Sequence, residues 1–258
     1  MEAGADEAIS NTPQDRFAQS QAQMAQVPKP PPEPVKPMPP AAKPARKASA
    51  TPPVTPIAAD AAASAAACRT LEELVEAIHG FDGCALKETA ANTVIQDGNP
   101  KARLMVIGEA PGAEEDRCGL PFVGPAGKLL DRMLAAIDLD RESVLITNIV
   151  FWRPPGNRNP TTDEIAACLP FSRRLIELVR PQVLVPVGGI AAKTLFETSE
   201  GITRLRGKWR DFTSPGLEAP IAAIATFHPA YLLRQPLQKR EAWQDLLAIM
   251  AKLDETGT

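Results

Sequence analysis

The C-terminal part of the chain contains four short runs made mostly of apolar residues. They are residues 103–107, 144–150, 183–187 and 221–227. Each run is long enough for one strand, and segments with apolar residues at helical spacing lie between the runs. Continuous apolar strands that alternate with helices are typical of a parallel sheet covered by helices on both faces. We therefore expect an α/β fold with three layers, α/β/α, around a central, mostly parallel sheet of four strands.

The N-terminal quarter of the chain has a different composition. Residues 1–67 hold 13 of the 27 prolines and a single aromatic residue, Phe17. A segment with so little apolar volume cannot offset the entropy lost on ordering. We expect a disordered Pro/Ala-rich tail over residues 1–67 and one folded domain over residues 68–258. The proline-rich stretch at residues 28–40 favours extended polyproline conformations, and it is either a spacer or a ligand for an unknown partner.

Charge and hydropathy exclude several classes of protein. The chain has 28 Lys and Arg against 31 Asp and Glu, a net charge of −3. This balance excludes a uniformly basic nucleic-acid binder but leaves room for a local basic face. No apolar run is long enough to span a membrane, and the first ten residues lack the features of a secretory signal. With four sparsely spaced cysteines, we expect a cytoplasmic monomer with reduced thiols and no membrane partner.

Turn-rich loops with polar tips follow three of the four apolar runs. GEAPGAEED (108–116) and GLPFVGPAG (119–127) come after the first, Asn148 and RPPGNRNP (153–160) after the second, and HPAYLLRQP (228–236) after the fourth. Sites in parallel sheets lie at the carboxyl ends of the strands, so these loops are the candidate site. None of them is a phosphate-binding loop, because the GxxxxGK[ST] pattern is missing.

In this order and spacing, GEAPG, PFVGPAG, TNIV with RPPGNR, and HPAYLLR closely resemble the motifs of the family 4 uracil-DNA glycosylases. The resemblance covers about residues 84–253. The family has a three-layer α/β/α fold, and its members flip deoxyuridine out of DNA and hydrolyse its N-glycosidic bond. The resemblance therefore implies a monofunctional uracil-DNA glycosylase of base excision repair, whose partner is uracil-containing DNA.

The resemblance also assigns roles to residues that contact the base. It places His228 at O2 of the leaving uracil, where a hydrogen bond stabilises the developing negative charge. Asn148 offers a donor and an acceptor for uracil O4 and N3–H. Phe122 matches the aromatic residue that stacks on the flipped base, with core packing as its alternative role. A backbone amide at Ala110 lies near O2, and the methyl group there narrows the pocket, which leaves the substrate breadth open.

The sequence offers two candidates for the carboxylate that activates the attacking water. Glu109 and Glu115 match carboxylates of the family's first motif. Glu109 has an equally weighted alternative role, which is to anchor the loop through backbone amides. A highly dissociative reaction requires little of a general base. The expectation is therefore that the loop supplies the carboxylate, without a choice between the two.

Two segments are expected to contact DNA. In the family, the loop after the catalytic histidine enters the minor groove with an apolar wedge that replaces the extruded base. Here that loop consists of Tyr231, Leu232, Leu233 and Arg234. The segment at residues 202–210, if extended, presents Arg206 and Lys208 on one basic face, and an ordinary solvated strand is its alternative. Arg153 and Arg158 are expected on the same side of the sheet.

Family 4 enzymes typically hold a [4Fe-4S] cluster on four cysteines. The corresponding positions in this chain are Phe81, Cys84, Trp152 and Cys168. Two thiolates cannot hold a four-thiolate cluster, so we expect a branch of the family without cofactor or metal. We also expect Phe81 and Trp152 to pack together, directly or through one side chain, in the space that the cluster fills in relatives.

Two other functions remain open at this point. One is a glycosylase for another deaminated base, which the Ala110 methyl group allows. The other is a non-catalytic protein that binds uracil-containing DNA, and the presence of both His228 and Asn148 argues against it.

Overall fold

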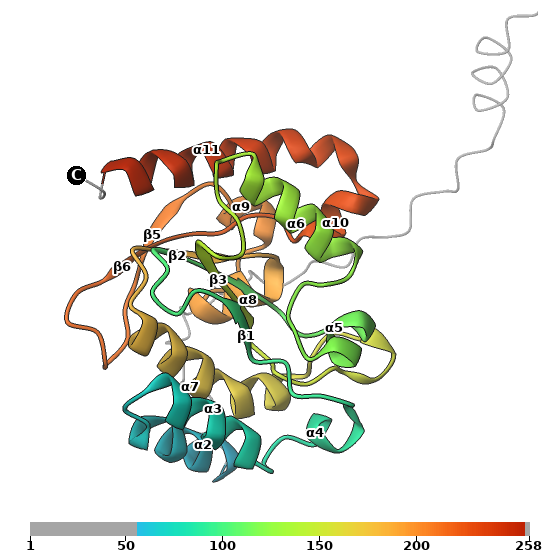
Figure 1. The fold of residues 1–258 in the computed structure, drawn as a ribbon, viewed down its shortest axis with the longest axis vertical. Helices are drawn as coiled ribbons and strands as arrows, with labels where there is room; N and C mark the ends of the chain where they lie inside the picture. Colours follow the sequence, from blue (N-terminus) through green and yellow to red (C-terminus); the bar gives the residue numbers. More distant parts are fainter. Residues whose placement is uncertain (1–55, 256–258) are drawn as a thin grey trace, which may run out of the picture. The chain divides into compact units, whose positions relative to one another are not determined.

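The computed structural model describes residues 56–255, which form a six-stranded sheet between two layers of helices (Figure 1). The strand order is β1-β3-β2-β4-β6-β5. The strands are β1 Gln96–Gly98, β2 Leu104–Gly108, β3 Val144–Asn148, β4 Val183–Pro186, β5 Trp209–Phe212 and β6 Ile221–Ile224. The four inner strands are parallel and correspond to the four apolar runs, so the α/β/α expectation is confirmed.

The sheet is wider than the four strands expected from the sequence. Strands β1 and β5 pair antiparallel with β3 and β6 at the two edges. Their sequences, QDG and WRDF, are short and largely polar, because an edge strand is covered on fewer sides than an inner one. The apolar pattern that reveals the inner strands is therefore absent from both.

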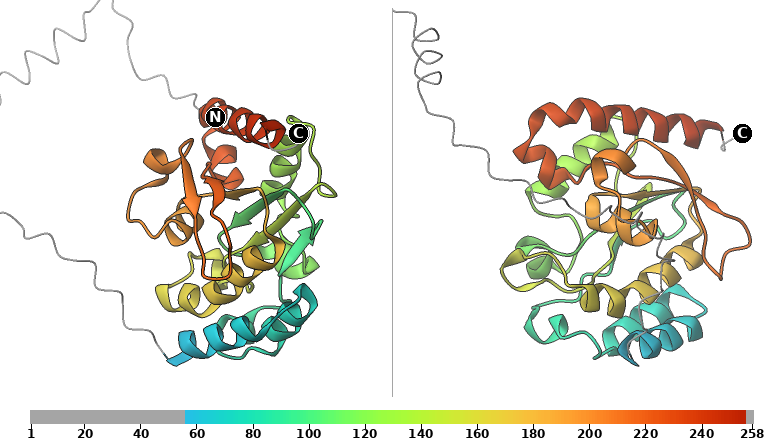
Figure 2. Two further views of the ribbon diagram at one scale, coloured as in Figure 1. Left: turned by 90° about the vertical axis from the view of Figure 1, so that its left-hand side faces the viewer. Right: turned by 180° about the vertical axis from the view of Figure 1, so that it is seen from behind.

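Helices cover both faces of the sheet (Figures 1 and 2). They are α2 Pro56–Ala67, α3 Leu71–Gly80, α4 Leu86–Thr89, α5 Ala113–Cys118, α6 Pro125–Ala135, α7 Thr162–Val179, α8 Gly189–Leu195, α9 Ile202–Leu205, α10 Pro229–Arg234 and α11 Lys239–Glu255, with 3-10 turns η1 Pro155–Asn157 and η2 Pro236–Gln238. Helix α7 lies between the sheet and the pair α2 and α3, whereas α6 and α11 lie on the opposite face. No helix in the described part of the chain is long and apolar enough to cross a membrane.

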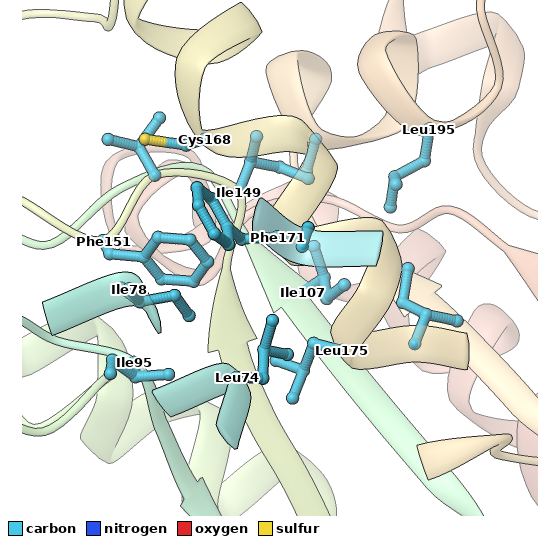
Figure 3. Close-up of a cluster of buried hydrophobic side chains, with 14 of the residues drawn as sticks. Leu74, Ile78, Ile95, Ile107, Ile149, Phe151, Cys168, Phe171, Leu175 and Leu195 are labelled. Atoms are coloured by element: carbon cyan, nitrogen blue, oxygen red, sulfur yellow. The ribbon is translucent and has the colours of Figure 1, made fainter. Parts of the chain in front are cut away.

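Side chains of each inner strand enter two separate cores. In β2, Met105 and Ile107 join the cluster under α7, which includes Phe171 and Leu175 (Figure 3). The alternate residues Leu104 and Val106 join the cluster under α6 and α11. Because both faces of the sheet are covered, every position of the strand is apolar. This explains why the strand reads as a continuous run rather than as an alternating pattern.

The folded domain begins earlier than the sequence suggested. Residues 56–67 form helix α2, so the prediction that the tail extends to residue 67 is wrong for this segment. Ala61 and Ala65 are buried against α7. An alanine-rich helix buries little area per residue, but its small side chains allow close approach to a neighbouring helix. Residues 1–55, with the proline-rich stretch, lie outside the described residues.

Parallel pairing aligns the carboxyl ends of the inner strands. Gly108 at the end of β2 pairs with Asn148 at the end of β3. On the other side of β2, Val187 beyond β4 bridges to Thr226, two residues before His228. The loops after β2, β3 and β6 therefore start from one edge of the sheet.

Candidate active site

A cavity of about 360 Å³ lies at this edge of the sheet. It is bounded by the loops after β2, β3 and β6. Residues on its wall include Glu109, Ala110, Glu115, Phe122, Asn148, Arg158, His228 and Arg234. The tertiary structure thus brings together every residue that the sequence assigned to base binding and catalysis.

Asn148 forms the inner wall of the cavity. Its side chain is buried and its amide makes no hydrogen bond within the described residues, so its donor and its acceptor are both available. Gly108 allows the amide to occupy this position, because a Cβ atom there would lie 2.3 Å from Asn148 Oδ1. The same atom would lie 2.6 Å from Cζ of Phe122. Both side chains therefore require glycine at position 108.

Phe122 adopts an unusual backbone conformation beside His228. Its φ is +55°, in the left-handed region that few non-glycine residues occupy. The ring stacks on the imidazole of His228, with 5.6 Å between centroids and 27° between planes. Phe122 also lines the cavity, although it is only 5% exposed and packs in the core under α6 and α11.

His228 is held as a neutral hydrogen-bond donor. It caps helix α10, and its Nδ1 accepts a hydrogen bond from the Ala230 amide at 3.1 Å. Burial, with the nearby positive charge of Arg234, lowers the pKa of His228 to about 4. At neutral pH the imidazole is therefore uncharged, and its proton resides on Nε2 because Nδ1 is occupied as an acceptor.

The two carboxylates of the first motif have different environments. Glu115 Oε1 accepts hydrogen bonds from the amides of Val123 at 3.0 Å and Gly124 at 2.9 Å. Its Oε2 accepts from Gly112 at 3.1 Å, so this side chain joins the two loops that follow β2. Glu109 makes no side-chain hydrogen bond within the described residues, and burial raises the pKa of its carboxyl group.

The residues after His228 do not all face solvent as expected. Leu232 is buried in the core under α6 and α11, so its predicted role as a wedge is wrong. Leu233 is 41% exposed and Arg234 is exposed beside the cavity. Tyr231 packs on Phe227 with 5.1 Å between ring centroids. The helical turn of α10 thus turns one leucine inward and the next outward.

The basic segment at residues 202–210 is also different from the expectation. Its first half is helix α9 rather than an extended strand, and Arg206 points into the protein. The Arg206 guanidinium binds the carboxylates of Asp245 and Glu241, with Nε 3.0 Å from Asp245 Oδ2. The predicted DNA contact through Arg206 is therefore wrong, because its side chain is only 14% exposed and lies between these two carboxylates. Lys208 is exposed and makes no ion pair within the described part of the chain.

Arg153 and Arg158 lie in the loop after β3 and have local partners. The Nε atom of Arg153 donates to Asn157 Oδ1 at 2.7 Å. Arg158 forms a two-point contact with Glu164, at 2.8 and 2.6 Å, and lines the cavity. Both arginines therefore lie at the edge of the sheet that carries the cavity, as expected. Asn157 and Glu164 set the orientations of their side chains.

Two thiols and two aromatic rings occupy the four positions that the family resemblance assigns to cluster ligands. Trp152 is fully buried, and its Nε1 donates to Thr93 Oγ1 at 3.1 Å. Trp152 packs edge-on against Phe151, which Figure 3 shows within the cluster under α7. Among the described ring pairs, Phe81 contacts Phe171 at 5.0 Å rather than Trp152. The two rings thus belong to one cluster but do not pair directly with each other.

Cys84 and Cys168 face each other in the same region. The interaction between the two thiols lowers the pKa of Cys84, whereas the same interaction and burial raise the pKa of Cys168. No group of three or more His, Cys, Asp or Glu side chains in residues 56–255 is placed to hold a metal. A four-thiolate cluster therefore does not fit the residues present.

Sequence reasoning missed one residue next to the site, Arg141. Its guanidinium donates to the backbone carbonyls of Pro121, at 3.1 Å, and Phe122. It also pairs with Asp97 and Asp131. Arg141 lies in a polar turn before β3, outside every motif, so nothing in the local sequence indicates a contact with the Phe122 loop.

Comparison with known proteins agrees with this geometry. Residues 95–247 match the model of the uracil DNA glycosylase superfamily. The type-4 uracil-DNA glycosylase of Archaeoglobus fulgidus is 42% identical over 170 residues, which cover 64% of this chain and 84% of the relative. The type-4 enzyme of Thermotoga maritima is 40% identical over 160 residues, covering 62% and 81%. A type-5 uracil-DNA glycosylase of Pyrobaculum aerophilum is 30% identical over 150 residues, covering 52% and 64%. With its motifs gathered around one cavity, the chain belongs to the type 4 family of the uracil-DNA glycosylase superfamily.

Proposed function

We propose that this protein is a DNA repair enzyme that flips deoxyuridine out of DNA and hydrolyses its N-glycosidic bond, leaving an abasic site. The observation that carries the proposal is the neutral His228, a donor through Nε2 that shares one cavity with the Asn148 amide and the Phe122 ring. These three groups provide hydrogen bonding and stacking for a flipped pyrimidine.

Asn148 provides the selection for uracil over cytosine. Uracil presents N3–H and O4, one donor and one acceptor, and the free amide of Asn148 pairs with both. Cytosine presents an acceptor at N3 and a donor at N4, so a fixed amide in this orientation would meet two mismatched groups. A buried polar group left unpaired costs about 1–3 kcal/mol, so two mismatched groups disfavour cytosine by roughly twice that amount.

His228 stabilises the leaving group. Negative charge builds on uracil O2 as the glycosidic bond lengthens, and a hydrogen bond from Nε2–H becomes stronger as the charge develops. An interaction that is stronger in the transition state than in the ground state accelerates the reaction. A neutral imidazole achieves this without titrating at physiological pH.

Glu109 is the carboxylate that we assign to the attacking water. Both oxygens of Glu115 accept hydrogen bonds from loop amides, which gives Glu115 an anchoring role. Glu109 is free of such bonds and lines the cavity, and its raised pKa favours proton acceptance near neutral pH. The backbone at Ala110 completes the wall near O2, with its methyl group limiting the size of the base.

We infer the DNA contacts from exposure and charge in the loops that follow the strands, where Arg158 and Arg234 line the cavity. We assign the apolar wedge to Leu233 and phosphate contacts to Arg234, Lys208 and Arg158. Arg153, which donates to Asn157, and Tyr231, which packs on Phe227, are assigned to hold these loops in place. The enzyme is proposed to work as a cytoplasmic monomer without an iron–sulfur cluster, and the proline-rich stretch to be either a spacer or a ligand for an unknown partner.

A strand-cleavage assay tests the proposal. Purified protein is incubated with a uracil-containing oligonucleotide, and abasic sites are converted to breaks by alkali. We expect cleavage at uracil only, and its loss in the His228→Ala variant. Parallel substrates with hypoxanthine, xanthine and thymine mispairs test the alternative of another deaminated base. Binding to uracil-containing DNA without breaks would instead indicate a non-catalytic protein.

A further inference from the structure

The backbone conformation of Phe122 is disfavoured for a bulky residue, so contacts with other parts of the protein must stabilise it. Its φ of +55° puts the chain in the left-handed region, where a Cβ atom clashes with the backbone. Such residues persist only where neighbouring groups hold them. The question is which groups hold Phe122, since its ring forms a wall of the base cavity.

The peptide that follows Phe122 is held on its amide side by Glu115. The carboxylate of Glu115 accepts hydrogen bonds from Val123 and Gly124. Helix α6 packs closely against the same segment. A Cβ atom on Gly127 of this helix would lie 1.6 Å from the Phe122 carbonyl oxygen. These contacts restrict the loop but leave the carbonyl groups of Pro121 and Phe122 to another partner.

That partner is Arg141, whose planar guanidinium donates to both carbonyls. The guanidinium is itself oriented by two carboxylates, Asp97 at 2.6 Å and Asp131 at 2.8 Å. Asp97 belongs to strand β1 and Asp131 to helix α6, so Arg141 connects the Phe122 loop to two rigid elements. Four directed contacts on one planar group determine its orientation, which a lysine ammonium cannot reproduce.

We propose that Arg141 is a positioning residue for uracil recognition, which acts by holding Phe122 in its left-handed conformation with the ring facing the cavity. The inference rests on the proposed function of Phe122 as the stacking surface. It assigns the affinity for the flipped base in part to a residue that does not line the cavity.

The affinity for free uracil is the informative measurement, because it reports the pocket without DNA binding or chemistry. It is obtained as the inhibition constant of uracil in the excision assay. Stacking of a base on an aromatic ring contributes about 1–3 kcal/mol, roughly 5- to 150-fold in affinity. We expect Arg141→Lys to raise the inhibition constant within this range, about tenfold, with a rise in KM larger than the fall in kcat.

Arg174→Lys is the matched control. Arg174 also joins a backbone carbonyl, that of Cys68 at 2.9 and 2.7 Å, to a carboxylate, Glu177 at 2.8 Å. It lies on α7, away from the cavity lining. We expect this variant to lose thermal stability comparably but to bind uracil as the wild type does.

A double-mutant cycle tests whether Arg141 acts through Phe122. Phe122→Leu removes the ring, so Arg141→Lys should have no further effect on uracil affinity in that background. If Arg141→Lys does not fold, Asp131→Asn, which removes one orienting carboxylate, should change the inhibition constant in the same direction by a smaller factor.

Two results would overturn the inference: an unchanged inhibition constant in folded Arg141→Lys, or effects of the two substitutions that simply add. Failure of the proposed function would look different. In that case the wild-type protein itself would release no uracil from DNA.

Discussion

Replacing Trp152 with alanine tests whether an aromatic ring has taken over a structural role at a cluster position. The side chain is 1% exposed and packs in the cluster that joins α3, α7 and the sheet. Removing a fully buried Trp side chain costs about 3–5 kcal/mol. Loss of the hydrogen bond to Thr93 Oγ1 adds about 1 kcal/mol. We therefore expect the free energy of unfolding to fall by about 4–6 kcal/mol.

The assay is urea unfolding followed by fluorescence, with calorimetry for the midpoint temperature. For a domain of roughly 200 residues, 1 kcal/mol corresponds to about 2–4 °C, so a loss of about 10–20 °C is expected. Trp243→Ala is the matched control, because Trp243 is 41% exposed and should cost about 1 kcal/mol or less. Equal destabilisation by the two substitutions would refute the packing argument.

The same protein preparation tests the absence of a cluster. Anaerobically purified protein should be colourless and contain no stoichiometric iron, because the four positions that the family resemblance assigns to the ligands hold two thiols and two rings. A brown chromophore with about four iron atoms per chain would contradict this reading and would require ligands other than these residues.

Three further predictions concern the site. His228→Ala should reduce single-turnover excision by about 100- to 1,000-fold, the loss typical of an oxyanion donor, and change DNA binding little; an unchanged rate would remove His228 from the mechanism. Gly108→Ala should abolish most activity while the protein stays folded, because the new methyl group would meet Asn148 Oδ1 at 2.3 Å and displace it or the Phe122 ring; retention of full activity on DNA would show that the amide is not needed there. The third prediction is on pH. Since the folded pKa of His228 is about 4 against 6.5 unfolded, the unfolded state binds more protons between these values, so stability falls as pH decreases through this window, by at most about 3 kcal/mol. His228→Ala should remove this dependence in denaturation curves measured across that range, and a slope that persists in the variant would assign it to other groups. Excision should also fall in acid as Glu109 becomes protonated, starting above the usual pKa of a glutamate because burial raises that pKa.

Local patterns in the sequence determined much of the fold. The four inner strands are apolar because both faces of the sheet are covered, and that property is visible residue by residue. Two helices start at capping boxes, Thr70 with Glu73 and Thr161 with Glu164, and the structure has both boxes. These interactions span three residues, so the sequence alone reports them.

The composition of the site was also visible, because its groups lie in short motifs at strand ends. Asn148, Phe122 and His228 come from three loops that are distant in the sequence, and parallel pairing of β2, β3, β4 and β6 brings them to one edge. A parallel sheet of known strand direction makes such a convergence predictable.

Only the tertiary structure decided which side chains of these motifs are free to act. Arg206 looks like a DNA contact until α11 brings Asp245, 39 residues away, against it. Leu232 and Leu233 are adjacent leucines that the sequence does not distinguish. Helices α6 and α11 cover Leu232, whereas Leu233 stays exposed. The left-handed Phe122 depends on Arg141, 19 residues further along the chain. In each case the deciding partner is distant in the chain, and the energies of burial and ion pairing arise only when folding brings the partners together.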